Sequence, residues 1–99
     1  MSYGLVGKFI AHPGKKKDLI AILLEAANLL QENKDCLQYL IGENDEKETV
    51  IVSEIWTTQQ AHDASLEPEN IRALIKNAMP LIASMSQSAQ FAILGGKGI

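Results

Sequence analysis

The chain is poor in cysteine and in long apolar runs, and each shortage excludes a class of protein. Cys36 is the only cysteine among 99 residues, so no disulfide can form within the chain and a reducing compartment is expected. The first residues contain no basic segment followed by a long apolar stretch, and no segment has the length and hydrophobicity of a membrane span. The sequence therefore predicts a soluble, cytoplasmic protein with no membrane partner.

The chain also lacks an excess of basic residues. It has 9 lysines and arginines against 12 aspartates and glutamates, which gives a net charge of -3. A nucleic-acid surface normally needs a clustered basic excess. The single basic run, residues 15–17, is typical of a solvated turn. We therefore expect no nucleic-acid partner.

Familiar catalytic and ligand-binding motifs are missing as well. His12 and His62 are far apart, and neither belongs to a cluster with recognisable metal-ligand spacing. The glycines within residues 95–98 do not follow the spacing of a phosphate loop and do not precede a helix. The chain has no nucleophile elbow and no Cys/His pair. These patterns argue against a metal site and against hydrolase chemistry.

What the chain does contain is a regular succession of strand-like and helix-like segments within one domain, residues 1–99. Alternating or β-branched runs predict strands at residues 4–11, 36–42, 49–56 and 88–94. Apolar stripes at helical spacing predict helices at residues 15–33, from 57 to about 66, and from Pro68 until Pro80 ends the pattern. The polar segment 43–47 predicts a hairpin connection between the second and third strands.

This order predicts an α+β fold of the ferredoxin-like split βαβ type, with an antiparallel sheet and helices on one face. Successive strand residues point to opposite faces, yet both faces are apolar: Leu5 and Phe9 oppose Val6 and Ile10. Helices from one short chain cover a single face, and each branched side chain left exposed costs about 1.5 to 3 kcal/mol. A second copy, packed sheet to sheet about a two-fold axis, removes this exposure, so we expect a homodimer.

The end of the third predicted strand is the most informative local feature. An apolar extended run stops at Trp56, the only tryptophan, and Thr57 with Gln60 forms a capping box that predicts the start of a helix. His62 follows six residues after the tryptophan. A tryptophan offers a flat apolar wall to an aromatic ring, and histidine is the side chain best suited to exchange a proton near neutral pH. We expect a small-molecule site at this junction.

Three further residues are candidates for binding a substrate. Tyr39 and Ser53 supply hydroxyl groups if their strand faces point into the pocket. Arg72 lies one helical turn from Lys76, so the pair either stabilises an anionic substrate or forms a solvated charged face. Cys36 has no basic neighbour in the sequence to lower its pKa, which favours a buried, unreactive thiol.

The strand ending Glu54-Ile55-Trp56, followed by residues 60–66 and an amphipathic helix, resembles the antibiotic biosynthesis monooxygenase family, including its quinol-monooxygenase-like members. The resemblance extends over nearly the whole chain. It implies a dimeric α+β barrel of two ferredoxin-like subunits, each with a pocket between its sheet and its helices. It also implies oxidation of a quinol or another small hydroxylated aromatic by O₂, with no cofactor.

The resemblance also implies roles for individual residues. Trp56 matches the strand-end tryptophan that lines the pocket in polyketide-oxidising members, and His62 falls where those members can carry a tyrosine. Val52 stands where they can carry an asparagine. Ser65 takes the place of a histidine that many quinol-type relatives have. On this basis His62 is the expected catalytic residue, and Trp56 and Ser65 are expected to contact the substrate.

Other activities of the same fold are less well matched or remain open. The asparagine, tryptophan and histidine used by the haem-degrading branch correspond to Lys8, Ser65 and Ile75, so haem degradation is not implied. Two alternatives from other classes stay open. One is a dimeric module that sequesters an apolar metabolite without turning it over, and the other is an isomerase or lyase that transfers a proton at a carbonyl.

Overall fold

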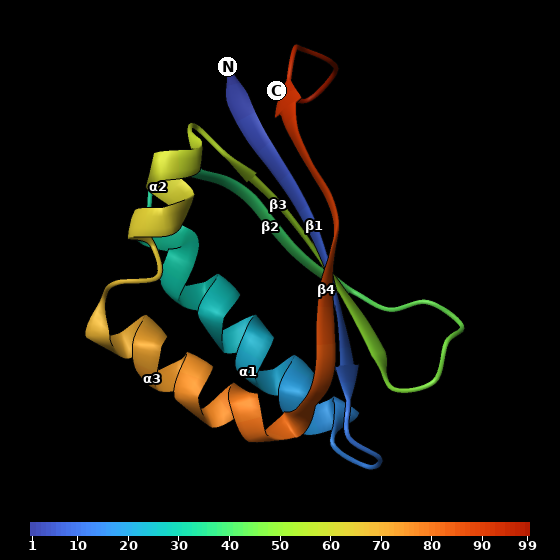
Figure 1. Ribbon diagram of the computed structural model, residues 1–99. Helices are drawn as coiled ribbons and strands as arrows, with labels where there is room; N and C mark the ends of the chain where they lie inside the picture. Colours follow the sequence, from blue (N-terminus) through green and yellow to red (C-terminus); the bar gives the residue numbers. More distant parts are fainter.

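The computed structural model describes residues 1–99 as one α+β unit (Figure 1). The strands are β1 (Ser2–Ala11), β2 (Cys36–Gly42), β3 (Thr49–Trp56) and β4 (Ile82–Ile93). The helices are α1 (Lys16–Leu29), α2 (Gln59–Ala64) and α3 (Glu69–Ala78), with short 3₁₀ turns at Leu30–Glu32 and Met79–Leu81. All neighbouring strands are antiparallel and lie in the order β2-β3-β1-β4. The predicted ferredoxin-like arrangement is confirmed.

The predicted element boundaries hold best where the chain is rich in β-branched residues. β2 and β3 have the predicted bounds, and they form the expected hairpin. The prediction for the last strand was wrong, because β4 begins at Ile82, well before residue 88. Residues 82–87 extend because β1 supplies a hydrogen-bonding partner along its whole length, from Ser2 opposite Ile93 to Ala11 opposite Ile82.

The start of α2 lies one residue later than the predicted capping box. Thr58 is the N-cap, with an extended backbone and a side-chain oxygen that accepts a hydrogen bond from the Ala61 amide at 3.0 Å. Thr57 instead donates its hydroxyl to Asp35 Oδ1 at 2.9 Å. The Thr57 amide also bonds to the Asp35 carbonyl, which ties the end of β3 to the start of β2 and leaves the capping role to Thr58.

Both prolines that were expected to bound the last helix do so. Pro68 is the N-cap residue of α3, and Pro80 lies in the 3₁₀ turn that follows Ala78. A proline at either place gives up no hydrogen bond that the helix needs. The chain therefore turns from α3 directly into β4.

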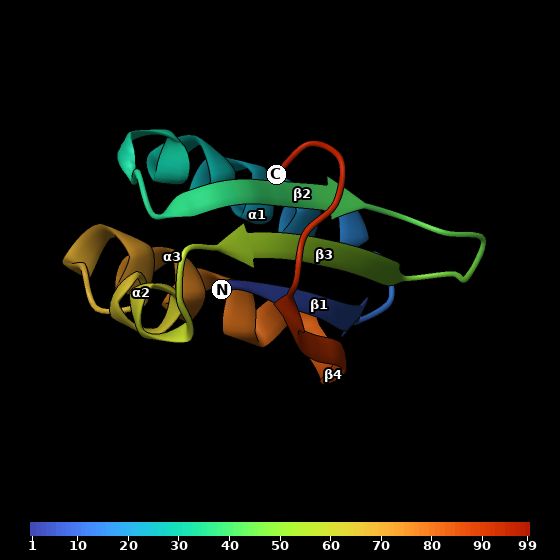
Figure 2. The ribbon, with the colours of Figure 1, turned by 90° about the horizontal axis from the view of Figure 1, so that it is seen from above.

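The helices cover one face of the sheet and leave the other bare. Figures 1 and 2 show α1 and α3 on the same side, with α2 beside the end of β3. The buried core lies between α1 and the middle of the sheet, where Leu19 and Leu23 pack with Val50 and Val52. No helix is both long and apolar enough to cross a membrane.

The bare face of the sheet, which we call the outer face, carries the second apolar surface that the sequence predicts. Strand register places six large apolar side chains on it: Val6, Ile10, Leu40, Ile51, Ile55 and Phe91. Ile10, Leu40 and Phe91 are 36%, 53% and 49% exposed. The Phe91 ring lies directly over Gly4, where an added Cβ would be 2.6 Å from Phe91 Cζ.

Candidate active site

A cavity of about 460 Å³ lies between the sheet and the helices. Strands β1, β3 and β4 form its floor, and the apolar sides of α1 and α3 form its roof. Of its 22 lining residues, 16 are hydrophobic, so the cavity suits a largely apolar molecule. The size is in the range usual for small-molecule pockets.

The middle of the cavity floor is open because Gly7, which lies there, has no side chain. Leu5, Gly7 and Phe9 alternate with outer-face residues along β1 and line the cavity. A Cβ added to Gly7 would have Phe9 Cε2 at 3.8 Å and the Ser86 carbonyl oxygen at 3.9 Å as its nearest neighbours. Only ordinary contacts surround this position, and a flat ring can lie over it.

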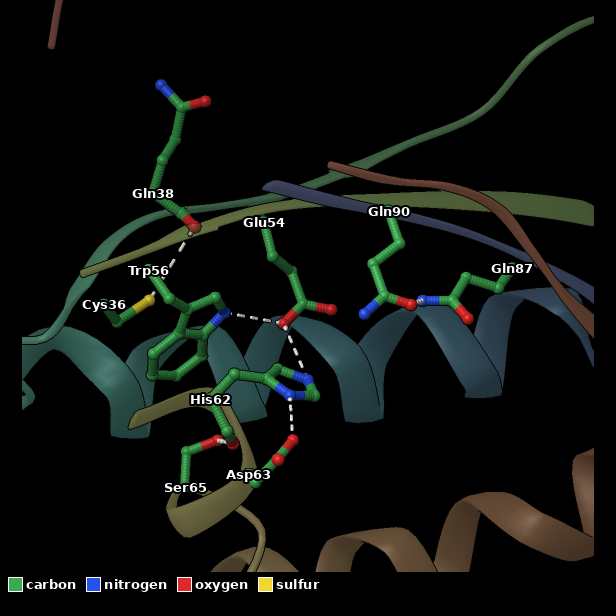
Figure 3. Close-up of polar contacts among 9 residues, drawn as sticks. All are labelled: Cys36, Gln38, Glu54, Trp56, His62, Asp63, Ser65, Gln87 and Gln90. Atoms are coloured by element: carbon green, nitrogen blue, oxygen red, sulfur yellow. Dashed lines mark hydrogen bonds and ion pairs between the residues drawn. The ribbon is translucent and has the colours of Figure 1, made fainter. Parts of the chain in front are cut away.

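One carboxylate projects into this apolar layer. Glu54 lies on β3 between Val52 and Trp56, which point to the same side. Trp56 Nε1 donates a hydrogen bond to Glu54 Oε1 at 3.0 Å, and His62 Nε2 lies 3.7 Å from the same oxygen (Figure 3). The Glu54 and His62 side chains are only 13% and 16% exposed. A carboxyl–imidazole pair is thus held largely away from water at the wall of the cavity.

Burial raises the pKa of the Glu54 carboxyl above its ordinary value of 4.5, while the Trp56 hydrogen bond and the charge of His62 act in the opposite direction. A carboxylate with a raised pKa is a better proton acceptor than one on the surface. Glu54 can therefore take a proton from a weak acid in the cavity and return it later.

His62 is fixed by contacts on several sides. Its Nδ1 lies 3.0 Å from Asp63 Oδ1, so both ring nitrogens face carboxylate oxygens. The ring packs edge-on against Trp56, with centroids 5.6 Å apart, and beside Tyr3 at 5.7 Å. These contacts hold Nε2 towards Glu54.

Two hydroxyl groups also line the cavity. Tyr39 lies opposite Glu54 in the β2–β3 register, and burial, reinforced by the negative charge of Glu54, strongly raises its pKa. Its phenol therefore remains a neutral hydrogen-bonding group. Ser65 is buried and donates its hydroxyl to the His62 carbonyl oxygen, so this hydroxyl serves to close α2 while the residue forms part of the wall.

Comparison with known proteins identifies the family. The model of the family described as antibiotic biosynthesis monooxygenase matches residues 2–77. The chain belongs to the antibiotic biosynthesis monooxygenase family. No curated protein matches its sequence.

Several solved structures have the same fold as this chain. A "putative Antibiotic biosynthesis monooxygenase" from Chloroflexus aurantiacus is 33% identical, with a TM-score of 0.89 over 100% of this chain and 99% of that one. A second protein with that description, from Caulobacter crescentus, is 18% identical, with a TM-score of 0.87 over 95% and 91%. A Mycobacterium tuberculosis protein is 14% identical, with a TM-score of 0.85 over 98% and 99%.

The structure of this antibiotic biosynthesis monooxygenase family member brings four of the six predicted site residues together. Trp56, His62, Tyr39 and Ser65 all line the cavity. Ser53 does not, because strand alternation places it on the outer face, opposite Val6 and Leu40.

Arg72 also lies outside the cavity. The side of α3 that faces the cavity carries Ile71, Leu74 and Ile75, and Arg72 is exposed elsewhere on that helix. Ser53 and Arg72, which were expected to face the pocket, thus do not line this cavity.

Sequence reasoning missed Glu54 as a site residue, although strand alternation alone puts it on the same face as Trp56. It also missed Gln87, a lining residue on β4. Cys36 is half-buried, not buried as expected, and desolvation raises the pKa of its thiol. No three His, Cys, Asp or Glu side chains are grouped to hold a metal ion.

Proposed function

We propose that this protein is a monooxygenase that oxidises a quinol or another small hydroxylated aromatic with O₂ and without a cofactor. The observation that carries the proposal is the Glu54–His62 pair, held against Trp56 at the wall of an apolar cavity. O₂ accepts electrons far more readily from a phenolate than from a phenol. A site of this kind therefore needs a proton acceptor and an apolar pocket, and this cavity supplies Glu54 and a mostly hydrophobic lining.

The first step is removal of a proton from a ring hydroxyl by Glu54. His62 Nε2 lies 3.7 Å from Glu54 Oε1, where its N–H or its protonated ring can stabilise the negative charge of Glu54 and of the substrate oxygen. The indole of Trp56 is buried against the pair and forms part of the cavity wall. The resulting phenolate passes an electron to O₂, and the two radicals combine to form a peroxide on the ring carbon.

The second step returns the proton. Glu54 protonates the peroxide, which loses water and leaves a carbonyl on the ring. For 1,4-naphthohydroquinone the sum is hydroquinone plus O₂ giving hydroxynaphthoquinone plus water. Four electrons leave the substrate, one oxygen atom enters the product and the other becomes water. The apolar side chains of α1 and α3 that line the cavity offer the peroxide few hydrogen-bonding groups.

Oxygen uptake with 1,4-naphthohydroquinone tests this function. We expect an enzyme-dependent rate above the autoxidation measured without protein, and incorporation of one oxygen-18 atom from ¹⁸O₂ into the hydroxyquinone. Catalase added in parallel separates this reaction from simple oxidation that yields hydrogen peroxide.

The other outcomes would replace the proposal. Tight binding of the hydroquinone without faster oxygen uptake indicates a sequestering module. Proton exchange on a hydroxyketone under argon, again without oxygen uptake, indicates an isomerase or lyase. Either result contradicts the monooxygenase assignment.

We also propose that the active form is a homodimer joined through the outer face. The support is the apolar surface around Ile55 and Phe91, which the helices of this chain do not cover. Exposed apolar patches of this kind mark contact sites in soluble proteins. A two-fold packing of identical sheets buries the patch on both copies at once.

Sedimentation equilibrium at micromolar concentration should give twice the mass of the chain. The variant Ile55→Lys should sediment as a monomer, because it places a charge in the middle of the buried contact. Asp45→Lys introduces the same side chain in the exposed β2–β3 loop and should stay dimeric. A stable, folded monomer of the unmodified chain would refute the dimer.

A further inference from the structure

Two glutamines on the edge strand β4 form a polar group at the far side of the cavity. Gln87 Nε2 donates a hydrogen bond to Gln90 Oε1 at 2.8 Å. Gln87 lines the cavity, and both residues lie on the helix-facing side, opposite Gly7 and Leu5 in the β1–β4 register. Their mutual bond leaves the Gln87 carbonyl oxygen, the second N–H of Gln87 and both N–H groups of Gln90 free to bind something else.

The Gln87–Gln90 pair faces the Glu54–His62 pair across an apolar space. Glu54 lies on β3 and Gln87 on β4, with β1 between them, so their strands are about 10 Å apart. Figure 3 shows the second carboxylate oxygen of Glu54 turned towards the two glutamines. The floor between the pairs is formed by Leu5 and by Gly7, which has no side chain.

This spacing defines the shape of the ligand. Both ends of the floor have groups that form hydrogen bonds, and the middle has none. A ring with a single hydroxyl satisfies one end only, and neighbouring hydroxyls on one side of a ring do the same. Gln87 and Gln90 are exposed on the edge strand. A ligand that reaches both ends therefore gains a hydrogen bond to Gln87 in place of one to water, and the site favours it over a ligand that reaches one end.

We infer that Gln87, held in place by Gln90, is a specificity-determining residue that binds the far oxygen of an aromatic diol whose two hydroxyl groups lie on opposite sides of the ring system. This inference rests on the proposed function for the role of Glu54 at the near oxygen. A neutral amide suits the far position, because it both donates and accepts and therefore holds the oxygen in the hydroxyl form and in the carbonyl form that oxidation produces.

Calorimetric titration under argon tests the inference without turnover. The ligands are 1,4-naphthohydroquinone, its isomer 1,2-dihydroxynaphthalene, and 1-naphthol, which lacks the second oxygen. We expect the unmodified protein to bind the 1,4-diol about fivefold more tightly than either of the others, which is the effect of one additional net hydrogen bond. In Gln87→Leu this preference should disappear, while the affinity for 1-naphthol stays unchanged.

Two further variants complete the test. Gln87→Met has a side chain of similar length with no amide and should behave as Gln87→Leu does. Gln59→Leu makes the same change at an exposed position outside the cavity and should keep the fivefold preference. Affinity for 1-naphthol reports in every case whether the pocket has folded.

The results separate this inference from the proposed function. If the preference for the 1,4-diol depends on Gln87 but no oxygen is consumed in air, the inference stands and the monooxygenase assignment fails. If the protein consumes oxygen but Gln87→Leu and Gln87→Met keep the preference, the role of Gln87 is refuted. Equal loss of affinity for all three ligands in both variants also refutes it, because a contact with the second oxygen cannot affect 1-naphthol.

Discussion

Glu54→Gln is expected to lower the enzyme-dependent rate of oxygen uptake with 1,4-naphthohydroquinone by at least about 100-fold, the usual contribution of a positioned general base. Glutamine keeps the size of the side chain and still accepts the hydrogen bond that Trp56 Nε1 now donates at 3.0 Å. It cannot take the hydroxyl proton. The loss should therefore lie in kcat, measured with an oxygen electrode at saturating hydroquinone.

The controls distinguish chemistry from packing. Glu25→Gln makes the same change on the exposed side of α1 and should leave the rate unchanged. His62→Ala should also slow the reaction, since it removes the group that faces the Glu54 carboxylate at 3.7 Å. Retention of the full rate by Glu54→Gln would show that the carboxylate is not the base, and retention by His62→Ala would remove the histidine from the mechanism.

The pH dependence of kcat/KM is a second test of Glu54 as the general base. Because burial raises the pKa of Glu54, the carboxylate forms only as the pH rises through a value above 4.5, and the rate should rise with it. This acidic limb should be absent from the residual activity of Glu54→Gln. An unchanged limb in that variant would assign the titration to another group.

Gly7→Leu is expected to reduce the affinity for 1,4-naphthohydroquinone by roughly 10- to 100-fold. The leucine side chain would stand on the open floor of the cavity, and forcing a ligand past it costs about 1.4 to 2.8 kcal/mol. The backbone of Gly7 does not have a positive φ, so a side chain is tolerated there without strain. Calorimetric titration under argon measures the affinity, and thermal unfolding confirms that the variant is folded.

A smaller substitution at Gly7 and the same substitution at a distant glycine are the controls for this prediction. Gly7→Ala adds a single carbon whose nearest neighbour is 3.8 Å away, so its affinity should stay within a few-fold of the unmodified protein. Gly42→Leu inserts a leucine at the end of β2, where nothing lies within 4 Å, and should not change binding. Unaltered affinity in Gly7→Leu would mean that the ligand does not occupy this floor.

The sequence predicts the fold well wherever local residue preference and tertiary packing favour the same structure. The run from Thr49 to Trp56 is β-branched and apolar, and its bounds are those predicted. The first half of β4 mixes small and polar residues with Ile82 and Met85, and it extends because β1 pairs with it, which no local pattern shows. The N-cap of α2 is Thr58 and not the expected Thr57, because Thr57 donates its hydroxyl to Asp35, 22 positions earlier in the chain.

The site was predictable to the extent that residue chemistry alone defines it. Trp56 and His62 are the chain's distinctive side chains near one junction, and the structure places them in contact. Glu54 was overlooked because carboxylates are usually solvated, and only its alternation with Trp56 signals burial. Gln87 gave no signal, since its place in the cavity depends on the irregular register between β1 and β4 near Gly7.

Successive residues of each strand point to opposite faces of the sheet, so the pairing register sets the composition of both faces together. Glu54 serves the cavity, and its neighbour Ile55 belongs to the outer face. A slip of one residue in the pairing of β3 would exchange them, placing a carboxylate on the bare side and an isoleucine in the pocket. Insertions or deletions within this strand should thus be far less tolerated than in the β2–β3 loop, because they would damage assembly and chemistry in a single event.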